Sequence, residues 1–152
     1  MTQPMEPHNT APSDFGGSLC SDSAYRQAEQ EGKVVVLPKG NELFIDVDSE
    51  AHEQLFHANL TKINEYVGVK GWVSNTSPSG YPQRKHIVVE LSRDVIPLER
   101  ILIQAVLGSD LRRELLSYCR WTLNDPNPTL FFEKGPALLP AAPEVKLLPA
   151  AV

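Results

Sequence analysis

The order of its hydrophobic patterns constrains this chain more than any other feature. Four stretches have the composition of strands: 43–48, 69–75, 85–91 and 129–133. A helical repeat over about 50–67 separates the first two of these strands, and two further helical stretches precede the last one. The order is therefore β-α-β-β-α-β, with the second helix broken at Gly108. It predicts an α+β, ferredoxin-like sheet with all its helices on one face.

Helix boundaries and helix faces follow from the same patterns. Ser49 or Asp48 is expected to cap the first helix, which Gly68 ends. Pro97 is expected to open the second helix and Ser109 or Asp110 to cap the third. The residues expected on the apolar sides of these last two helices are Leu98, Ile101, Leu102 and Ala105, then Leu111, Leu115 and Cys119.

The ends of the chain differ in composition from its middle. Most of the 13 prolines in the 152 residues lie near the ends, where large aliphatic residues are scarce. Such segments bury too little surface to offset the entropy of ordering. We therefore predict a disordered N-terminal tail over 1–32, in which 22–31 could form one short polar helix, and a Pro/Ala-rich flexible tail over 135–152. The folded domain is predicted to span 33–134, with 34–37 adding an N-terminal strand that pairs with 43–48 as a hairpin.

The net charge of −5 limits the partners of the chain. A protein that holds nucleic acid by its phosphates alone is normally basic, so this chain needs a local basic patch or a bridging cation. No stretch approaches the ~18 apolar residues of a membrane span, and the N-terminus lacks the pattern of a secretory signal. The two cysteines have no metal-binding spacing. These features favour a cytoplasmic protein that does not contact a membrane.

The topology gathers three chemically active side chains. In a ferredoxin-like sheet the strand order is last, first, third, second, so the strand of Asp46 and Asp48 neighbours the strand of His86. Side chains alternate across a strand, and the apolar positions between these residues should face the helices. Asp46, Asp48 and His86 are therefore predicted to share the open face.

Two aspartates at i and i+2 on one strand repel each other unless a cation lies between them. Mg²⁺ or Mn²⁺ is the expected ion, because hard cations prefer carboxylate oxygens and in turn bind phosphates.

An ordinary structural role exists for two of these three residues. Asp48 is well placed to cap the next helix, and His86 could be a half-exposed strand histidine. Asp46 is harder to explain this way, because strand interiors disfavour aspartate.

Two motifs resemble a known family. Phe44-Ile45-Asp46-Val47-Asp48 resembles the apolar-Asp-x-Asp motif of the archaeo-eukaryotic primase superfamily, which includes the primase-polymerases of phages and plasmids. Ser77-Pro78-Ser79-Gly80 followed by Arg84-Lys85-His86 is similar to that family's second motif, a Gly-containing loop leading to His and an apolar strand. The resemblance implies an RRM-like core, divalent metals on Asp46 and Asp48, and His86 on the phosphates of a nucleotide. Glu133 is the nearest candidate for the family's third, acidic metal ligand.

Further residues are candidates for holding phosphates. Arg84 and Lys85 lie at the rim of the loop, and Ser77 and Ser79 could donate hydrogen bonds or simply shape the turn. Arg112 and Arg113 follow a helix start, where free amides can hold a phosphate. For these two arginines we favour the ordinary interpretation, in which they pair with Glu114 or water.

The first functional hypothesis is divalent-metal-dependent nucleotidyl transfer in phage or plasmid DNA replication, with Asp46, Asp48 and His86 as catalytic residues. Its partners would be a nucleoside triphosphate and a nucleic-acid template, with other replication proteins reached through the tails. The alternative is a non-catalytic RRM-like module that binds nucleic acid or protein on its open face. In either case Phe44, Trp72 and Phe131 could stack on bases.

Overall fold

The computed structural model describes residues 21–134, 145, 146 and 148, and the remaining parts of both predicted tails lie outside it. Within these residues the chain is an α+β protein with four helices and two antiparallel sheets. In chain order the elements are α1 (Ser21–Gln30), β1 (Lys33–Val36), β2 (Glu42–Val47), α2 (Glu50–Val67), β3 (Val69–Thr76), β4 (Lys85–Leu91), α3 (Pro97–Val106), α4 (Leu111–Thr122), β5 (Phe131–Lys134) and β6 (Val145–Lys146). Helix α1 forms within the segment predicted as the N-terminal tail, and β6 within the predicted C-terminal one.

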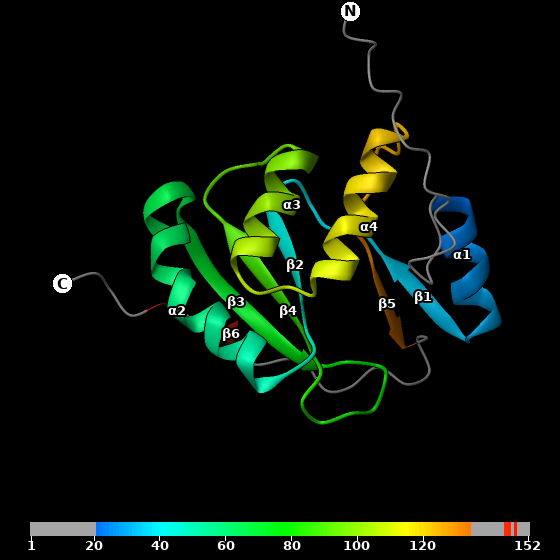
Figure 1. Cartoon of the computed structure of the whole chain (residues 1–152), viewed down its shortest axis with the longest axis horizontal. Coiled ribbons are helices and arrows are strands. Elements are labelled where there is room, and N and C mark those ends of the chain that lie inside the picture. The colour runs from blue at the N-terminus through cyan, green and yellow to red at the C-terminus, as the bar shows by residue number, and fades with distance from the viewer. Residues whose placement is uncertain (1–20, 135–144, 147, 149–152) are drawn as a thin grey trace, which may run out of the picture.

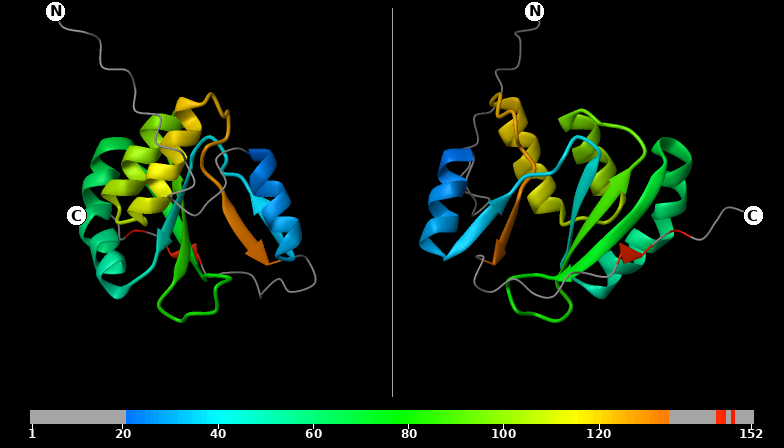
Figure 2. Two further views of the ribbon diagram at one scale, coloured as in Figure 1. Left: turned by 45° about the vertical axis from the view of Figure 1, so that its right-hand side comes forward. Right: turned by 180° about the vertical axis from the view of Figure 1, so that it is seen from behind.

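The larger sheet has the strand order β2-β4-β3-β6. Helices α2, α3 and α4 lie on one side of it (Figure 1), while α1 stands apart beside β1 and β5 (Figure 2). The predicted adjacency of β2 and β4 is confirmed, and their antiparallel register places Asp46 opposite His86. This pairing fixes the position of the candidate site.

The predicted N-terminal hairpin is wrong, and so is the predicted place of the last strand. Strand β1 pairs with β5 in a separate two-stranded sheet, with Val36 opposite Phe131. The last strand therefore does not extend the larger sheet beside β2.

The outer edge of β2 explains this difference, because polar groups from α3, from α4 and from the turn between them already bind it. The backbone N–H of Phe44 donates to Gln104 Oε1 at 2.8 Å, and the carbonyl of Phe44 accepts from Arg113 at 2.7 Å. The N–H of Asp46 donates to Ser109 Oγ at 3.0 Å, and the carbonyl of Asp46 accepts from the Asp110 N–H at 2.8 Å. These bonds occupy the backbone N–H and C=O groups of the edge as a neighbouring strand would. Strand β5 therefore cannot pair with β2 there.

The hydrophobic core lies between the larger sheet and its helices. Strand β2 turns Leu43, Ile45 and Val47 toward the helices, and α2 covers them with Phe56 and neighbouring apolar residues. The alternation predicted for these strand residues is confirmed, which leaves Asp46 and His86 on the side away from α2.

Local signals at the helix ends are also confirmed. The Ser49 hydroxyl accepts from the N–H of His52 at the start of α2, and Gly68 ends that helix with a φ of 76°. Pro97 opens α3, and Asp110 caps α4 by accepting from the N–H of Arg113. Gly108 separates α3 from α4 with a φ of 80°, a conformation that favours glycine.

The predicted buried side of α4 is wrong. Leu111 and Leu115 are 62% and 52% exposed, whereas Glu114, Ser117 and Arg120 are buried. Leu102 of α3 is likewise exposed rather than packed in the core. The physical reason is the polar edge of β2. Helix α4 turns hydrogen-bonding side chains toward that edge, and its leucines face outward.

None of the helices among the described residues is long and apolar enough to span a membrane.

Candidate active site

The candidate site is a pocket of about 490 Å³ between β2, β4, the β3–β4 loop, α4 and β5. Most of the side chains that the sequence singled out lie on its walls. These are Asp46, Asp48, Ser77, Ser79, His86, Arg112 and Arg113. The pocket thus collects residues from segments that are more than sixty positions apart in the sequence.

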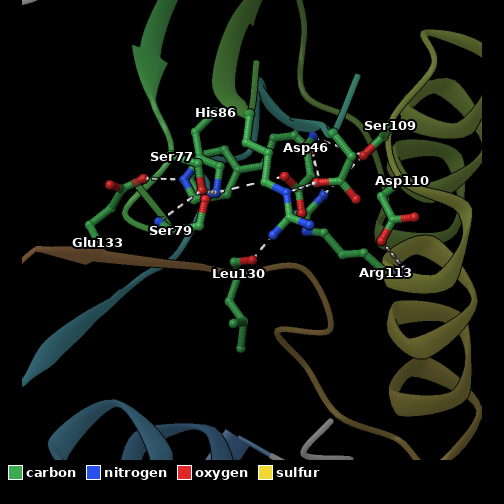
Figure 3. A network of polar contacts seen from close by, with 12 residues as sticks. Asp46, Ser77, Ser79, His86, Ser109, Asp110, Arg113, Leu130 and Glu133 are labelled. Atoms are coloured by element: carbon green, nitrogen blue, oxygen red, sulfur yellow. Dashed lines mark hydrogen bonds and ion pairs between the residues drawn. The ribbon is translucent and has the colours of Figure 1, made fainter. Parts of the chain in front are cut away.

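His86 is held tightly at the centre of this arrangement (Figure 3). The residue is 7% exposed, and its ring stacks on Phe131 with 3.9 Å between the ring centroids. The Nδ1 atom lies 2.6 Å from Glu133 Oε1. An ionised carboxylate only accepts hydrogen bonds, so Nδ1 carries a proton and donates it to Glu133. The Nε2 atom is then directed toward the pocket.

The Nε2 side of His86 meets two other candidate residues. The Ser77 hydroxyl lies 3.4 Å from Nε2, and the nearer carboxylate oxygen of Asp46 lies 3.8 Å from it. Ser79 donates its backbone N–H to the same Ser77 hydroxyl at 3.4 Å. The loop serines therefore both shape the turn and line the pocket beside the imidazole.

Three carboxylates form one wall of the pocket: Asp46, Asp48 and Asp110. Burial raises the pKa of Asp48, and repulsion from Asp46 and Asp110 raises it further. Arg84 compensates only weakly, since its Nε lies 3.8 Å from the Asp48 carboxylate. At Asp48, therefore, the repulsion from the other two carboxylates outweighs the attraction of Arg84.

Arg112 and Arg113 of α4 also line the pocket, but they differ in availability. Arg113 donates to the carbonyls of Phe44 and Leu130 and to Glu114, so its donors are engaged within the protein. The interpretation favoured from sequence is confirmed for Arg113, which pairs with Glu114 at 2.7 Å. Arg112 is exposed and lines the pocket, so its guanidinium can reach a bound anion.

Three candidate residues lie outside the pocket walls. Lys85 points to the helix side, where it forms an ion pair with Glu53 of α2 at 2.6 Å. Arg84 lies at the rim, over the ring of Tyr81. Glu133 lies on the Nδ1 side of His86, and the imidazole separates it from Asp46. The structure therefore joins Asp46 and Asp48, but not Glu133, into one acidic group.

The residues present suit a divalent cation that a substrate helps to hold. Among the side chains that the structure describes, no group of three or more His, Cys, Asp or Glu is arranged to bind a metal ion. Mg²⁺, however, commonly uses only one or two protein carboxylates together with water and substrate phosphates. Asp46 and Asp48 provide such a pair, and the raised pKa of Asp48 marks a charge that a cation would relieve.

The two phenylalanines suggested for base stacking are not available for it. Phe44 and Phe131 are 2% and 3% exposed, and their rings stack on each other with centroids 4.4 Å apart. Trp72 packs edge-on against Phe56 on the helix side. The pocket wall instead gains Lys33, Asp110 and Arg120, which sequence reasoning missed. The sequence could not indicate Lys33, because its position at the pocket follows from the pairing of β1 with β5.

Comparisons of this chain with protein-family models, curated proteins and solved structures found no match.

Proposed function

We propose that this chain is a divalent-cation-dependent nucleotidyl-transfer domain of the primase-polymerase type, acting in the cytoplasm on phage or plasmid DNA replication. The proposal includes a ferredoxin-like, RRM-like core, β2-α2-β3-β4-α3/α4-β5, from which the last strand has separated. The observation that carries it is the single pocket in which Asp46, Asp48, Ser77, Ser79 and His86 meet.

The acidic and the basic residues of the pocket would divide the chemistry. Asp46 and Asp48 would hold Mg²⁺ or Mn²⁺ at the acidic wall. When bound, such a cation neutralises phosphate oxygens and polarises the phosphorus that is attacked. Arg112 faces the same space and would bind the terminal phosphates of a nucleoside triphosphate.

His86 would act directly on the nucleotide. With Nδ1–H given to Glu133, its Nε2 can accept a hydrogen bond when the ring is neutral or donate one to a phosphate oxygen when the ring is protonated. Burial and stacking on Phe131 fix the ring, so no reorganisation is needed when charge develops on the phosphates. Ser77 adds a hydroxyl at the same point.

The alternative of a non-catalytic RRM-like module has less support. Such modules bind bases on exposed aromatic rings of the sheet. Here Phe44 and Phe131 are buried against each other, and Phe131 also stacks on His86. A module that bound through this face would have to expose both rings, one of which, Phe131, lines the pocket.

The test compares wild type with the double variant Asp46→Asn plus Asp48→Asn. Isothermal titration would measure Mn²⁺ affinity and Mn²⁺-dependent triphosphate affinity, and labelled-nucleotide incorporation on a primed template would measure transfer. We expect at least a tenfold loss of both affinities and no detectable transfer. Asp94→Asn, at an exposed aspartate outside the pocket, is the matched control. Triphosphate binding that survives both EDTA and the double substitution would refute the proposal.

The role of Glu133 can be separated from that of the aspartates. Because its carboxylate binds His86 Nδ1, we expect Glu133→Gln to slow transfer by about tenfold or more while leaving Mn²⁺ affinity within about twofold. The same titration checks this prediction. A loss of Mn²⁺ affinity equal to that of Asp46→Asn would instead make Glu133 a third metal ligand.

A further inference from the structure

Helix α4 carries its apolar residues on the outside. Leu111, Leu115 and Tyr118 recur at i, i+4 and i+7 and are between 46% and 62% exposed. Glu114, Ser117 and Arg120 face inward and are buried. A surface helix ordinarily shows the reverse pattern, with its apolar stripe toward the core.

Exposed apolar residues also lie on the neighbouring helix. Helices α3 and α4 lie side by side over the sheet (Figure 1), and Leu102 and Val106 of α3 are also exposed. Trp121 lies beside Tyr118, with 6.2 Å between the ring centroids. We call this surface the α3–α4 patch; it consists of Leu102, Val106, Leu111, Leu115, Tyr118 and Trp121.

The fold itself does not require the patch to be apolar. The inward side of α4 supplies the contacts that hold it to β2 and β5, through Glu114 and through Arg113 beside it. Outward positions with no structural duty are normally polar, and contiguous apolar surface of several hundred Å² marks an interaction site.

We propose that the α3–α4 patch is the contact between two copies of this chain. The exposed apolar area of the patch favours a second copy as the partner. With about 100 Å² for each aliphatic side chain and about 200 Å² for each ring, the exposed parts of the patch come to roughly 400 Å². A standard interface takes about 800 Å² from each partner, of which about 65% is apolar in homodimers. The patch therefore supplies most of the apolar area that a dimer needs.

The shape and charge of the patch fit a twofold contact. A row of residues at i, i+4 and i+7 forms a ridge that packs into the groove of a second helix, and a twofold axis brings the same apolar surface from both copies together. Arg112, the exposed charged residue within Leu111–Thr122, also lines the pocket and is not part of the patch. The patch residues themselves are uncharged, so two copies can meet there without like-charge repulsion.

The contact leaves the candidate site open. Arg113, Leu116 and Arg120 line the pocket from the other side of α4. Dimer formation is therefore independent of the proposed catalytic function, and either can fail without the other.

Sedimentation equilibrium of the full chain between about 5 and 200 μM tests the proposal. We expect a species of twice the 16.8 kDa chain mass for wild type. Leu115→Glu and Leu111→Glu each place a charge in the centre of the patch and should weaken the dimer at least about 30-fold. Both positions are exposed in the single chain, so circular dichroism should show unchanged folding.

Tyr81→Glu is the control, since Tyr81 is 56% exposed on the β3–β4 loop, outside the patch. It should leave the dimer intact. A wild-type chain that stays monomeric at 200 μM overturns the proposal. It does so even if the patch then proves to bind some other protein. A dimer that neither leucine variant weakens overturns it as well, because the contact then lies elsewhere.

Discussion

Asp48 shows how a single side chain can store electrostatic strain. Its carboxyl is partly buried and faces Asp46 and Asp110, and both effects raise its pKa above the ordinary 3.8. The folded protein then binds this proton more tightly than the unfolded chain does. The carboxyl therefore contributes stability at low pH that is lost as pH rises above its ordinary value.

Asp46→Asn removes one of the two repelling neighbours. We expect the pKa of Asp48 to fall toward 3.8, and the metal-free variant to be more stable than wild type at pH 7 but not at pH 3. Carboxyl-carbon NMR titration and urea unfolding at the two pH values measure both effects. Glu65→Gln, which removes one exposed negative charge on α2, should change neither. An unchanged Asp48 titration in Asp46→Asn would contradict this account.

At the scale of single elements, α4 behaves as a substitute for a strand. Glu114 accepts hydrogen bonds from Gln104, Ser109 and Arg113 at 2.7–2.9 Å, and each of these residues also binds the edge of β2. Burial raises the pKa of Glu114, and the Arg113 guanidinium opposes that shift. One buried carboxylate thus positions the three side chains that bind the edge of β2.

Glu114→Ala should therefore be strongly destabilising. It leaves the partly buried guanidinium of Arg113 without its carboxylate partner and frees two further donors, which predicts a loss of about 3 kcal/mol or more in the free energy of unfolding. Urea unfolding followed by circular dichroism gives this value. Glu65→Ala, the same substitution at an exposed helical glutamate, should cost no more than about 0.5 kcal/mol. Equal costs at the two sites would show that the network does not hold β2.

Gly108, in the turn between α3 and α4, sets the angle at which α4 reaches the sheet. Its φ of 80° is unfavourable for other residues, and an added Cβ would lie 2.8 Å from the His52 carbonyl oxygen of α2. Gly80 has nearly the same φ, 81°, but no atom within 4 Å of the Cβ position. We expect Gly80→Ala to cost about 1 kcal/mol and Gly108→Ala at least about 2 kcal/mol more. Thermal unfolding of the two variants compares them directly, and similar costs would mean that the backbone contact is relieved by a small shift.

For the molecule as a whole, sequence predicted what depends on local signals and on the order of the elements. The ends of α2 at Ser49 and Gly68 and the break at Gly108 follow from capping residues and from glycine, and the adjacency of the strands of Asp46 and His86 follows from the order of helices and strands. The partner of β1 could not be predicted, because β1 lies outside that order and its pairing with the distant β5 leaves no local pattern.

The orientation of α4 could not be predicted for a related reason. Its leucines recur at helical spacing and so indicate a buried stripe, but the direction of that stripe depends on what β2 needs at its edge. Glu114, Ser117 and Arg120 form an equally regular polar stripe at i, i+3 and i+6. Only the position of an unsatisfied strand edge decides which stripe faces inward.

Two side chains of β5 contact the larger sheet: Glu133, which binds His86, and Phe131. Phe131 of β5 is buried, stacks on Phe44 and His86 of the larger sheet, and lies under the Arg113 guanidinium at 4.6 Å. Phe132, the next residue, is only half-buried. The joint between the sheets is therefore also the back wall of the candidate site.

Phe131→Ala should loosen that joint and the site together. We expect a loss of about 3–5 kcal/mol from the cavity that it leaves, against a smaller loss for Phe132→Ala. Hydrogen exchange should become faster in β1 and β5 first, while the β2-β4-β3 ladder stays protected, because the larger sheet keeps its own core under α2. If exchange instead became faster equally in all strands, the two sheets would unfold as one cooperative unit, and the ring would be a part of the common core rather than a joint.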